Sequence, residues 1–224
     1  MSWRRDPMLP RVELKTDLSQ ATKAMVFAAR LCYGQEHKAT SEAEDLALLR
    51  KILDAGHWSI LEHATAAFYF SNVSRNFTHQ LVRHRHMSFA QQSFHYTVAT
   101  DKDAPVSPDL PSGCAEELIR HAFKNSFQAY AELLRIGVSK EEARHVLPSG
   151  ISTRIVATAN LREWVQFVQT RLCSVNCFEI KEVAGQVMMQ LRSALPYLRP
   201  VLGPKCLTGP CPEGKRSCGR PWKC

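Results

Sequence analysis

Only two segments of the chain have the pattern of a buried strand, and unequal groups of helical segments separate them. These segments are Glu62–Ser71, which is rich in aromatic residues, and Thr153–Ala157. Nearly all of the other periodic sequence repeats its apolar residues every three or four positions, as amphipathic helices do. Because strands and helices do not alternate regularly, the pattern predicts an α+β fold with a mixed or antiparallel sheet and several packed helices.

Capping residues mark where the predicted helices begin. Asp17 is expected to cap the first helix, and Ser41 with Glu44 forms a capping box for the second. The polar run Ser88–Ser93 cannot bury a face, so it is predicted to be a loop. Further helices are predicted from Ser74 into the RHRH sequence at residues 83–86, over Cys114–Ile136, after the cap Ser139, over Leu161–Cys173 after the cap Asn160, and over Phe178–Leu195.

The positive charge of the chain is concentrated near its end. The 224 residues have a formal net charge of +8. Residues 199–224 hold six basic residues and one acidic residue, so this segment carries +5 and the other 198 residues carry only +3. A body so nearly neutral has no general basic face. We therefore expect no nucleic-acid partner, and any anion bound by the body should be small and held by local arginines.

The chain has no segment that predicts a membrane anchor. Its longest uncharged apolar stretch, Ala64–Phe70, is far shorter than the roughly 20 residues that cross a bilayer. The first ten residues, MSWRRDPMLP, contain no apolar signal region. We therefore expect a cytoplasmic protein that does not bind membranes.

Four of the eight cysteines lie within the last 19 residues, among glycines and prolines. In a protein without a secretion signal, such a cluster more often binds a metal through thiolates than forms disulfides. The gaps between these cysteines are wider than those of a typical zinc knuckle, so a flexible tail is the alternative. The predicted zinc ligands are Cys206, Cys211, Cys218 and Cys224.

Six of the nine histidines fall within 39 residues, His57 to His95, which also contain three arginines. At a helix end, the consecutive residues Arg83, His84 and Arg85 fan over about 200° and must face different neighbours. A bare RHR triplet is adequately explained as a solvated helix terminus, which favours cations. The loop that follows it points to a function.

The string RHRHMSFAQQSFHY, residues 83–96, resembles the signature of the flavin-dependent thymidylate synthases, in which a serine follows RHR after seven residues. Further segments resemble this family in order and approximate spacing, and together they cover roughly residues 17–195. They are GHWSILEH at residues 56–63, Gln80, ARHVLP at residues 143–148, TRIVATANLREW at residues 153–164, and residues 171–179.

The resemblance implies the fold of these synthases and a catalytic domain over residues 1–198, followed by the basic, Cys-rich tail at residues 199–224. It implies reductive methylation of dUMP to dTMP, with 5,10-methylenetetrahydrofolate as carbon donor, FAD as redox cofactor and NADPH as reductant. It also implies a homotetramer. The charge distribution agrees, because all these ligands are anions and arginine grips phosphate without a glycine-rich loop.

Residue roles follow from the resemblance by position. The predicted FAD-binding residues are His57, Ser59, Arg83, His84, Arg85, His86, Gln91, Asn160, Arg162 and Gln166. The predicted dUMP-binding residues are Gln80, Arg83, Gln91, Gln92, Ser93, Phe94, His95, Arg144 and Arg171. Arg171 is the predicted catalytic residue, because a guanidinium against ring nitrogen 3 of uracil stabilises the ionised ring that methylation at carbon 5 requires.

Three positions depart from the family pattern. His95 stands where arginine is usual, Ala90 where asparagine is frequent, and Val175 where some members have histidine. These departures leave open an FAD-binding homologue that has lost thymidylate synthesis. A nucleic-acid-binding module with a zinc-binding tail is the other alternative, and it predicts steeply salt-dependent binding.

Overall fold

A computed structural model describes residues 9–100, 103, 114–220 and 222. The four strands are β1 (Arg11–Leu14), β2 (Thr65–Ser74), β3 (Ser88–Gln91) and β4 (Ser152–Asn160). The α-helices are α1 (Ala21–Leu31), α2 (Glu42–Asp54), α3 (Arg75–Leu81), α4 (Cys114–Arg135), α5 (Lys140–Ala143), α6 (Leu161–Arg171) and α7 (Phe178–Ala194). Short 3-10 helices are η1 (Trp58–His63), η3 (Arg144–Val146), η4 (Pro196–Leu198), η5 (Lys205–Leu207) and η6 (Gly214–Arg216).

The strands form one antiparallel sheet in the order β1-β2-β4-β3, so the predicted α+β class is confirmed. The two central strands are the two predicted from sequence: β2 has the predicted length but begins three residues later, and β4 extends to Asn160, three residues beyond its predicted end. The prediction of a loop at Ser88–Ser93 is wrong, because Ser88–Gln91 forms the edge strand β3. A polar edge strand is held by backbone hydrogen bonds and needs no apolar run, so the sequence pattern does not reveal it.

The other edge strand, β1, was not predicted from the sequence. It has four residues, of which only Val12 is buried. Glutamine side chains of α7 satisfy its backbone: the N–H groups of Val12 and Leu14 donate to Gln186 Oε1 and Gln190 Oε1 at 3.1 and 2.7 Å. Because these contacts join residues more than 170 positions apart in the sequence, no local sequence pattern indicates them.

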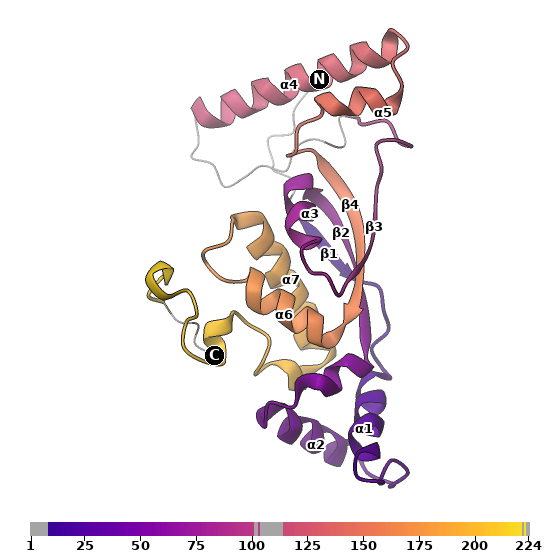
Figure 1. The fold of residues 1–224 in the computed structure, drawn as a ribbon, viewed down its shortest axis with the longest axis vertical. Helices are drawn as coiled ribbons and strands as arrows, with labels where there is room; N and C mark the ends of the chain where they lie inside the picture. The colour runs from indigo at the N-terminus through magenta and orange to yellow at the C-terminus, as the bar shows by residue number, and fades with distance from the viewer. Residues whose placement is uncertain (1–8, 101–102, 104–113, 221, 223–224) are drawn as a thin grey trace. The chain divides into compact units, whose positions relative to one another are not determined.

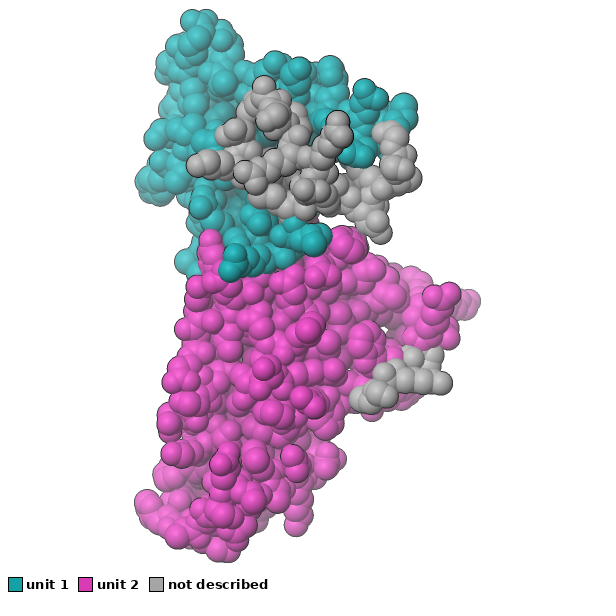
Figure 2. All heavy atoms as spheres, turned by 180° about the vertical axis from the view of Figure 1, so that it is seen from behind, with its two compact units in different colours: residues 1–11, 70–83, 90–156 teal, residues 12–69, 84–89, 157–224 magenta. Residues whose placement is uncertain are grey.

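Contacts divide the chain into two compact units, which Figure 2 shows in different colours. Unit 1 comprises residues 1–11, 70–83 and 90–156, and unit 2 comprises residues 12–69, 84–89 and 157–224. In unit 1, α4 and α5 lie next to each other (Figure 1). The core beneath them is formed by Phe94, Ala99, Phe127, Tyr130, Ala143 and Ile151.

In unit 2, α6 packs against α7 and also against η1, while α1 packs against α2 (Figure 1). Helix α6 is anchored to β2 at two points. The N–H of Leu161 donates to the carbonyl of Ala64 at 2.9 Å, and the indole of the fully buried Trp164 donates to the carbonyl of Ala66 at 2.9 Å. These bonds fix where α6 begins and which face it buries.

Most predicted helix caps are confirmed. The side chains of Ser41, Ser74, Ser139 and Asn160 each accept a backbone N–H three residues further on, as capping requires. The prediction for Asp17 is wrong: α1 begins later, at Ala21, and Gln20 in its cap position provides no side-chain bond. The Asp17 carboxylate instead accepts the N–H of Ser19 at 2.8 Å in the preceding turn.

The segment that follows α7 packs against α6 and α7 within unit 2. Val201 and Leu202 are buried, and their carbonyls accept hydrogen bonds from Gln169 of α6 and Arg192 of α7 at 3.3 and 2.5 Å. The division between a catalytic domain and a tail at residue 198 stays a prediction. Within the described ranges, no helix is both long and apolar enough to span a membrane.

Candidate functional site

The RHR sequence lies in a turn and not in the helix where it was expected. Helix α3 ends at Leu81, so residues 83–86 follow it as turns. His84 is buried, whereas Arg83, Arg85 and His86 are exposed. The three RHR side chains therefore have different surroundings, as their consecutive positions predict, and the histidine is the one that enters the protein.

The His84 ring lies between a carboxylate and a guanidinium of α6. Its Nδ1 is 2.9 Å from Glu163 Oε1. The Nε–H of Arg171 donates to His84 Nε2 at 3.1 Å. His84 and Glu163 are only 6% and 5% exposed. All three residues belong to unit 2, and we call them the Glu163–His84–Arg171 chain.

The surroundings of this chain are aromatic. The His84 ring meets the edge of Phe167 with centroids 5.2 Å apart, and Phe167 in turn contacts Trp164 at 5.6 Å. Trp164 also packs edge-on against Phe68 of β2 at 4.7 Å. Water is therefore largely excluded from the imidazole, and hydrogen bonds in such surroundings are stronger and more directional than in solvent.

Burial lowers the pKa of His84 below its ordinary value of 6.5, and the positive charge of Arg171 acts in the same direction. The hydrogen bond and the negative charge of Glu163 oppose this shift without reversing it. Burial also lowers the pKa of Arg171, while the nearby Cys177 has the opposite effect. At neutral pH the imidazole is therefore uncharged, between one anion and one cation.

The residues predicted to hold FAD are mostly exposed donors on two elements of unit 2 that pack together. His57 and Ser59 lie at the start of η1, and Arg162 and Gln166 lie on α6. Arg162 also pairs with Glu62 of η1 at 2.5 Å. Guanidinium, imidazole, hydroxyl and amide groups suit an anionic dinucleotide, so this donor set fits FAD.

Two predicted FAD residues already have partners within unit 2. The Asn160 side chain caps α6 by accepting the N–H of Glu163 at 2.9 Å. Both ring nitrogens of His84 are engaged by α6. Direct flavin contact by these two residues stays a prediction, and their observed bonds shape α6 instead. The exposed Arg85 and His86 belong to the same unit.

In unit 1, hydrogen bonds join the loop at residues 91–95 to two neighbouring elements. The amide of Gln91 donates to Thr78 Oγ1 of α3 at 3.2 Å and to Thr153 Oγ1 of β4 at 3.4 Å. The backbone N–H of Gln92 donates to the carbonyl of Arg154, also on β4, at 2.9 Å. These bonds fix the segment that carries most of the predicted dUMP-binding residues.

Arg75, at the start of α3, supports the same loop, and no role for it was predicted. Its guanidinium lies over the ring of Phe94 at 5.1 Å and donates to the carbonyl of Gln92 at 3.2 Å. Burial lowers the pKa of Arg75, and the positive charge of Arg144 adds to this effect. Arg75 follows the cap residue Ser74 and is one of the three arginines in the histidine-rich segment at residues 57–95, but neither feature indicates its contact with the loop.

The other predicted dUMP residues of unit 1 have more solvent around them. His95 Nδ1 lies 3.4 Å from Glu141 Oε2, and an Arg144 nitrogen lies 3.9 Å from Glu141 Oε1. Ser93 Oγ accepts the N–H of His95 at 3.2 Å, a turn contact. Gln80 is half-buried on α3, and Arg83 is exposed after it. Of the other two departures from the family pattern, Ala90 is exposed on β3 and Val175 is 50% exposed.

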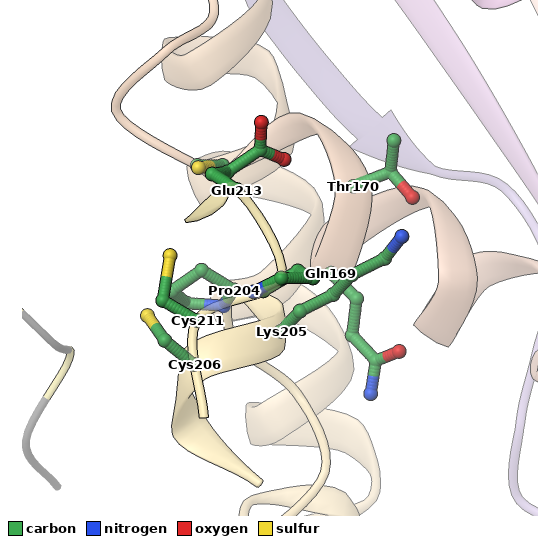
Figure 3. Close-up of a pocket in the computed structure, with 9 residues that line it drawn as sticks. Gln169, Thr170, Pro204, Lys205, Cys206, Cys211 and Glu213 are labelled. Atoms are coloured by element: carbon green, nitrogen blue, oxygen red, sulfur yellow. The ribbon is translucent and has the colours of Figure 1, made fainter. Parts of the chain in front are cut away.

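The structure does not support the predicted zinc site. Cys206 and Cys211 line a pocket of about 40 Å³ together with Cys173 and Glu213, and Figure 3 shows these two cysteines among its lining residues. Cys218 is exposed. Among the described residues, no three or more His, Cys, Asp or Glu side chains are arranged to hold a metal. The fourth predicted ligand, Cys224, lies outside the described residues.

Comparison with known proteins identifies the family of the chain. The sequence profile described as "Thymidylate synthase complementing protein" matches residues 13–197. A protein of Geobacter sulfurreducens, named flavin-dependent thymidylate synthase, is 40% identical over 207 residues, which are 88% of each chain. One of Pyrococcus abyssi with the same name is 36% identical over 219 residues, covering 91% of this chain and 89% of that protein.

A solved structure shares the fold. The UMP/dUMP methylase PolB from Streptomyces cacaoi, crystallised with 5-Br dUMP, superposes with a TM-score of 0.72 at 23% identity, covering 86% of this chain and 93% of that one. The family profile spans most of the chain, including the Glu163–His84–Arg171 chain and the loop at residues 91–95. The chain belongs to the family of flavin-dependent thymidylate synthases.

Proposed function

We propose that this protein converts dUMP to dTMP by reductive methylation, with 5,10-methylenetetrahydrofolate as carbon donor, FAD as redox cofactor and NADPH as reductant. Membership of the family supports the reaction. The observation within the molecule that carries the proposal is the arrangement of Arg171, whose Nε is held by a buried, neutral imidazole. An oriented, half-buried guanidinium can stabilise the negative charge that develops when a uracil ring is activated.

Arg171 is the proposed catalytic residue. Carbon 5 of uracil must become electron-rich before it accepts the one-carbon unit, and negative charge then develops on ring nitrogen 3 and the adjoining carbonyl. A fixed cation at that edge stabilises the charge without reorganising in the transition state. Lysine is a poorer substitute, because an ammonium is a point charge and not a planar group.

The loop at residues 91–95 of unit 1 and several neighbouring residues are proposed to bind the rest of dUMP. The residues proposed to bind it are Gln80, Arg83, Gln91, Gln92, Ser93, Phe94, His95 and Arg144, in addition to Arg171 of unit 2. The bonds of Gln91 to Thr78 and Thr153, and the contacts of Arg75, order part of this loop before any ligand binds. Ordering beforehand lowers the conformational entropy that binding must overcome.

FAD is proposed to lie against His57, Ser59, Arg83, His84, Arg85, His86, Gln91, Asn160, Arg162 and Gln166. When bound, it supplies the redox chemistry that links NADPH to the carbon unit. The exposed arginines would bind its diphosphate, and Glu62 orients Arg162 for this task. Because seven of these side chains are exposed, we further propose that the cofactor is enclosed by other copies of the chain in a homotetramer. A cytoplasmic location remains part of the proposal.

The test combines a spectrum with a labelled reaction. Purified protein should show oxidised-flavin absorbance, and the released chromophore should be FAD. With NADPH and methylenetetrahydrofolate labelled at the methylene carbon, mass spectrometry should find that label in dTMP. Omission of NADPH is the control. A flavoprotein that transfers no label would instead be a homologue without synthase activity. A colourless protein with steeply salt-dependent DNA binding would favour the nucleic-acid alternative.

A further inference from the structure

Glu163 is the buried carboxylate of the Glu163–His84–Arg171 chain. The sequence patterns assign it no function, and it stands out only as an acidic residue in the first turn of α6. Its side chain is 5% exposed. A carboxylate in such surroundings is strongly destabilised unless hydrogen bonds and opposite charge compensate it. The His84 Nδ1 contact at 2.9 Å supplies one such bond, and Arg171 supplies the opposite charge beyond the ring.

The residues at the two ends of the chain, Arg171 and Glu163, determine which atom donates and which accepts in each hydrogen bond. Arg171 Nε always carries a hydrogen, so at 3.1 Å His84 Nε2 must accept it. An ionised Glu163 can only accept, so His84 Nδ1 must donate to it. Together the two bonds require a neutral imidazole with its proton on Nδ1. Burial, which lowers the pKa of His84, acts toward the same neutral form.

The spacing along α6 explains how one ring reaches all its partners. Glu163, Phe167 and Arg171 are four residues apart from one to the next, so they lie on the same face of the helix over successive turns. The imidazole lies along this face, with a carboxylate at one nitrogen, an aromatic edge at 5.2 Å from centroid to centroid, and the guanidinium at the other nitrogen. A change at Glu163 can therefore reach Arg171 through the His84 ring.

We propose that Glu163 is a positioning residue for Arg171: by accepting the Nδ1 proton of His84, it fixes the tautomer whose Nε2 orients the guanidinium toward the uracil ring. This inference rests on the proposed function, because it gives the orientation of Arg171 a purpose. The arrangement resembles the carboxylate–histidine pairs behind metal ions, in which the carboxylate fixes ring orientation and increases the basicity of the distal nitrogen. Here the distal nitrogen holds a guanidinium.

Two substitutions separate hydrogen bonding from charge. Glu163→Gln keeps the length of the side chain and an oxygen acceptor but removes the negative charge. Glu163→Asp keeps the charge but is one methylene too short to reach Nδ1 from the same backbone position. If Glu163 orients His84, Gln should retain most of the activity and Asp should lose it. If only the charge matters, Asp should retain the activity and Gln should lose it.

The expected kinetic result is a selective loss of turnover. Because displacement of a catalytic group by about 1 Å typically slows a reaction by up to a hundredfold, Glu163→Asp and Glu163→Ala should lower kcat about tenfold or more. The KM for dUMP and the flavin content per chain should change less than about threefold, because orientation matters most as ring charge develops. Glu163→Gln should stay within about threefold of the wild-type kcat.

A matched control removes another partly buried carboxylate of unit 2. Asp45 accepts hydrogen bonds from Arg30 at 2.9 Å and Thr40 at 2.7 Å, and the Arg30 and Asp45 side chains are 11% and 18% exposed. Neither Arg30 nor Asp45 belongs to the proposed site. Asp45→Asn should therefore lower the thermal midpoint without changing kcat per folded chain. An equal loss of kcat in Asp45→Asn and Glu163→Asp would overturn the proposal.

A spectroscopic measurement tests the same inference without turnover. Nitrogen NMR of histidine-labelled protein, with His84 assigned by its replacement, should show the neutral Nδ1–H form in the wild type and in Glu163→Gln. Glu163→Asp should lose this form. An imidazolium or an Nε2–H tautomer in the wild type would overturn the proposal. Absence of labelled dTMP from the wild type would overturn the proposed function, whereas equal rates in all Glu163 variants would overturn only the role of Glu163.

Discussion

Arg171 and Arg144 are both proposed to bind the same nucleotide, yet they are held very differently. Arg171, in unit 2, bonds to a ring that is 6% exposed. The Arg144 side chain, in unit 1, is 39% exposed and lies 3.9 Å from a glutamate that is 54% exposed. Exposed pairs contribute about 0 to 1 kcal/mol and are screened by salt, whereas buried hydrogen-bonded chains are directional and persistent. The comparison indicates that unit 2 fixes the orientation of the proposed catalytic group, while the proposed contacts of unit 1 are adjustable.

The largest effect is expected from Arg171→Ala. Loss of a fixed cation where charge develops should remove about 3 kcal/mol or more of transition-state stabilisation, which is a hundredfold or greater loss of turnover. Flavin content should change little. Arg171→Lys should recover only part of the rate, because it lacks the planar group. Turnover with saturating substrates checks this, and a native rate in Arg171→Ala would make Arg171 an ordinary helix-terminal cation.

The control for that experiment is Arg83→Ala. Arg83 is exposed and proposed to contact both FAD and dUMP. Its replacement should lower flavin occupancy or raise the dissociation constant of dUMP, with a smaller effect on the chemical step. If Arg83→Ala and Arg171→Ala had the same kinetic profile, the contrast between a fixed catalytic group and adjustable contacts would be lost.

A smaller effect is expected from Arg75→Ala in unit 1. Its contacts with Phe94 and the carbonyl of Gln92 combine a cation–π interaction with a hydrogen bond, and losing both should weaken dUMP binding about tenfold. Arg154 provides a matched comparison, because it also bonds to Gln92, at Oε1 and 3.1 Å, but is exposed. Calorimetry should find a clearly weaker effect for Arg154→Ala. If Arg154→Ala weakened dUMP binding more than Arg75→Ala, burial would not decide which arginine supports the loop.

The pH dependence of stability provides a third test of the buried chain. The pKa of His84 is lowered by burial below its ordinary value of 6.5, so the unfolded chain binds this proton more readily than the folded one. The stability linked to neutral His84 is therefore fully present above about pH 6.5 and is lost as the pH falls toward the lower folded value. The groups facing the ring are Glu163, Phe167 and Arg171 of α6.

Urea unfolding at several pH values would measure this loss, with His84→Gln as the comparison. The variant should show a shallower fall in unfolding free energy on acidification, because it lacks the titrating group. Parallel curves for the two proteins would contradict the buried, neutral state of His84. The exposed histidines serve as an internal reference, since both proteins retain them.

The smallest effect is expected from Glu141→Gln. Glu141 faces His95 and Arg144, and all three side chains are well exposed. Removing its charge should change the unfolding free energy by less than about 1 kcal/mol. A modest effect on dUMP affinity should disappear at high salt, where exposed charges are screened. A large effect that survives high salt would show that unit 1 also contains a preorganised charged site.

The sequence predicted the central strands, most caps and the α+β class, because each leaves a local pattern. The apolar residues of β2 and β4 follow the pattern of a buried strand. A serine or asparagine that precedes apolar residues at helical spacing marks where a helix starts. The edge strands β1 and β3 leave no such pattern, since partners distant in sequence complete them. Likewise, no spacing rule connects His84 to Glu163 across 79 residues. Arg171 was singled out only through resemblance to the family, and its role stays a prediction.

The four-residue spacing on α6 also constrains how the sequence can vary by insertion and deletion. One residue added between Glu163 and Phe167, or between Phe167 and Arg171, would rotate everything beyond it by about 100° around the helix axis. Such a change would separate the members of the chain even if every side chain were kept. Substitutions at any position of α6 leave this register unchanged, whatever they do to the contacts of the replaced side chain. Among related sequences, this segment should therefore keep its length.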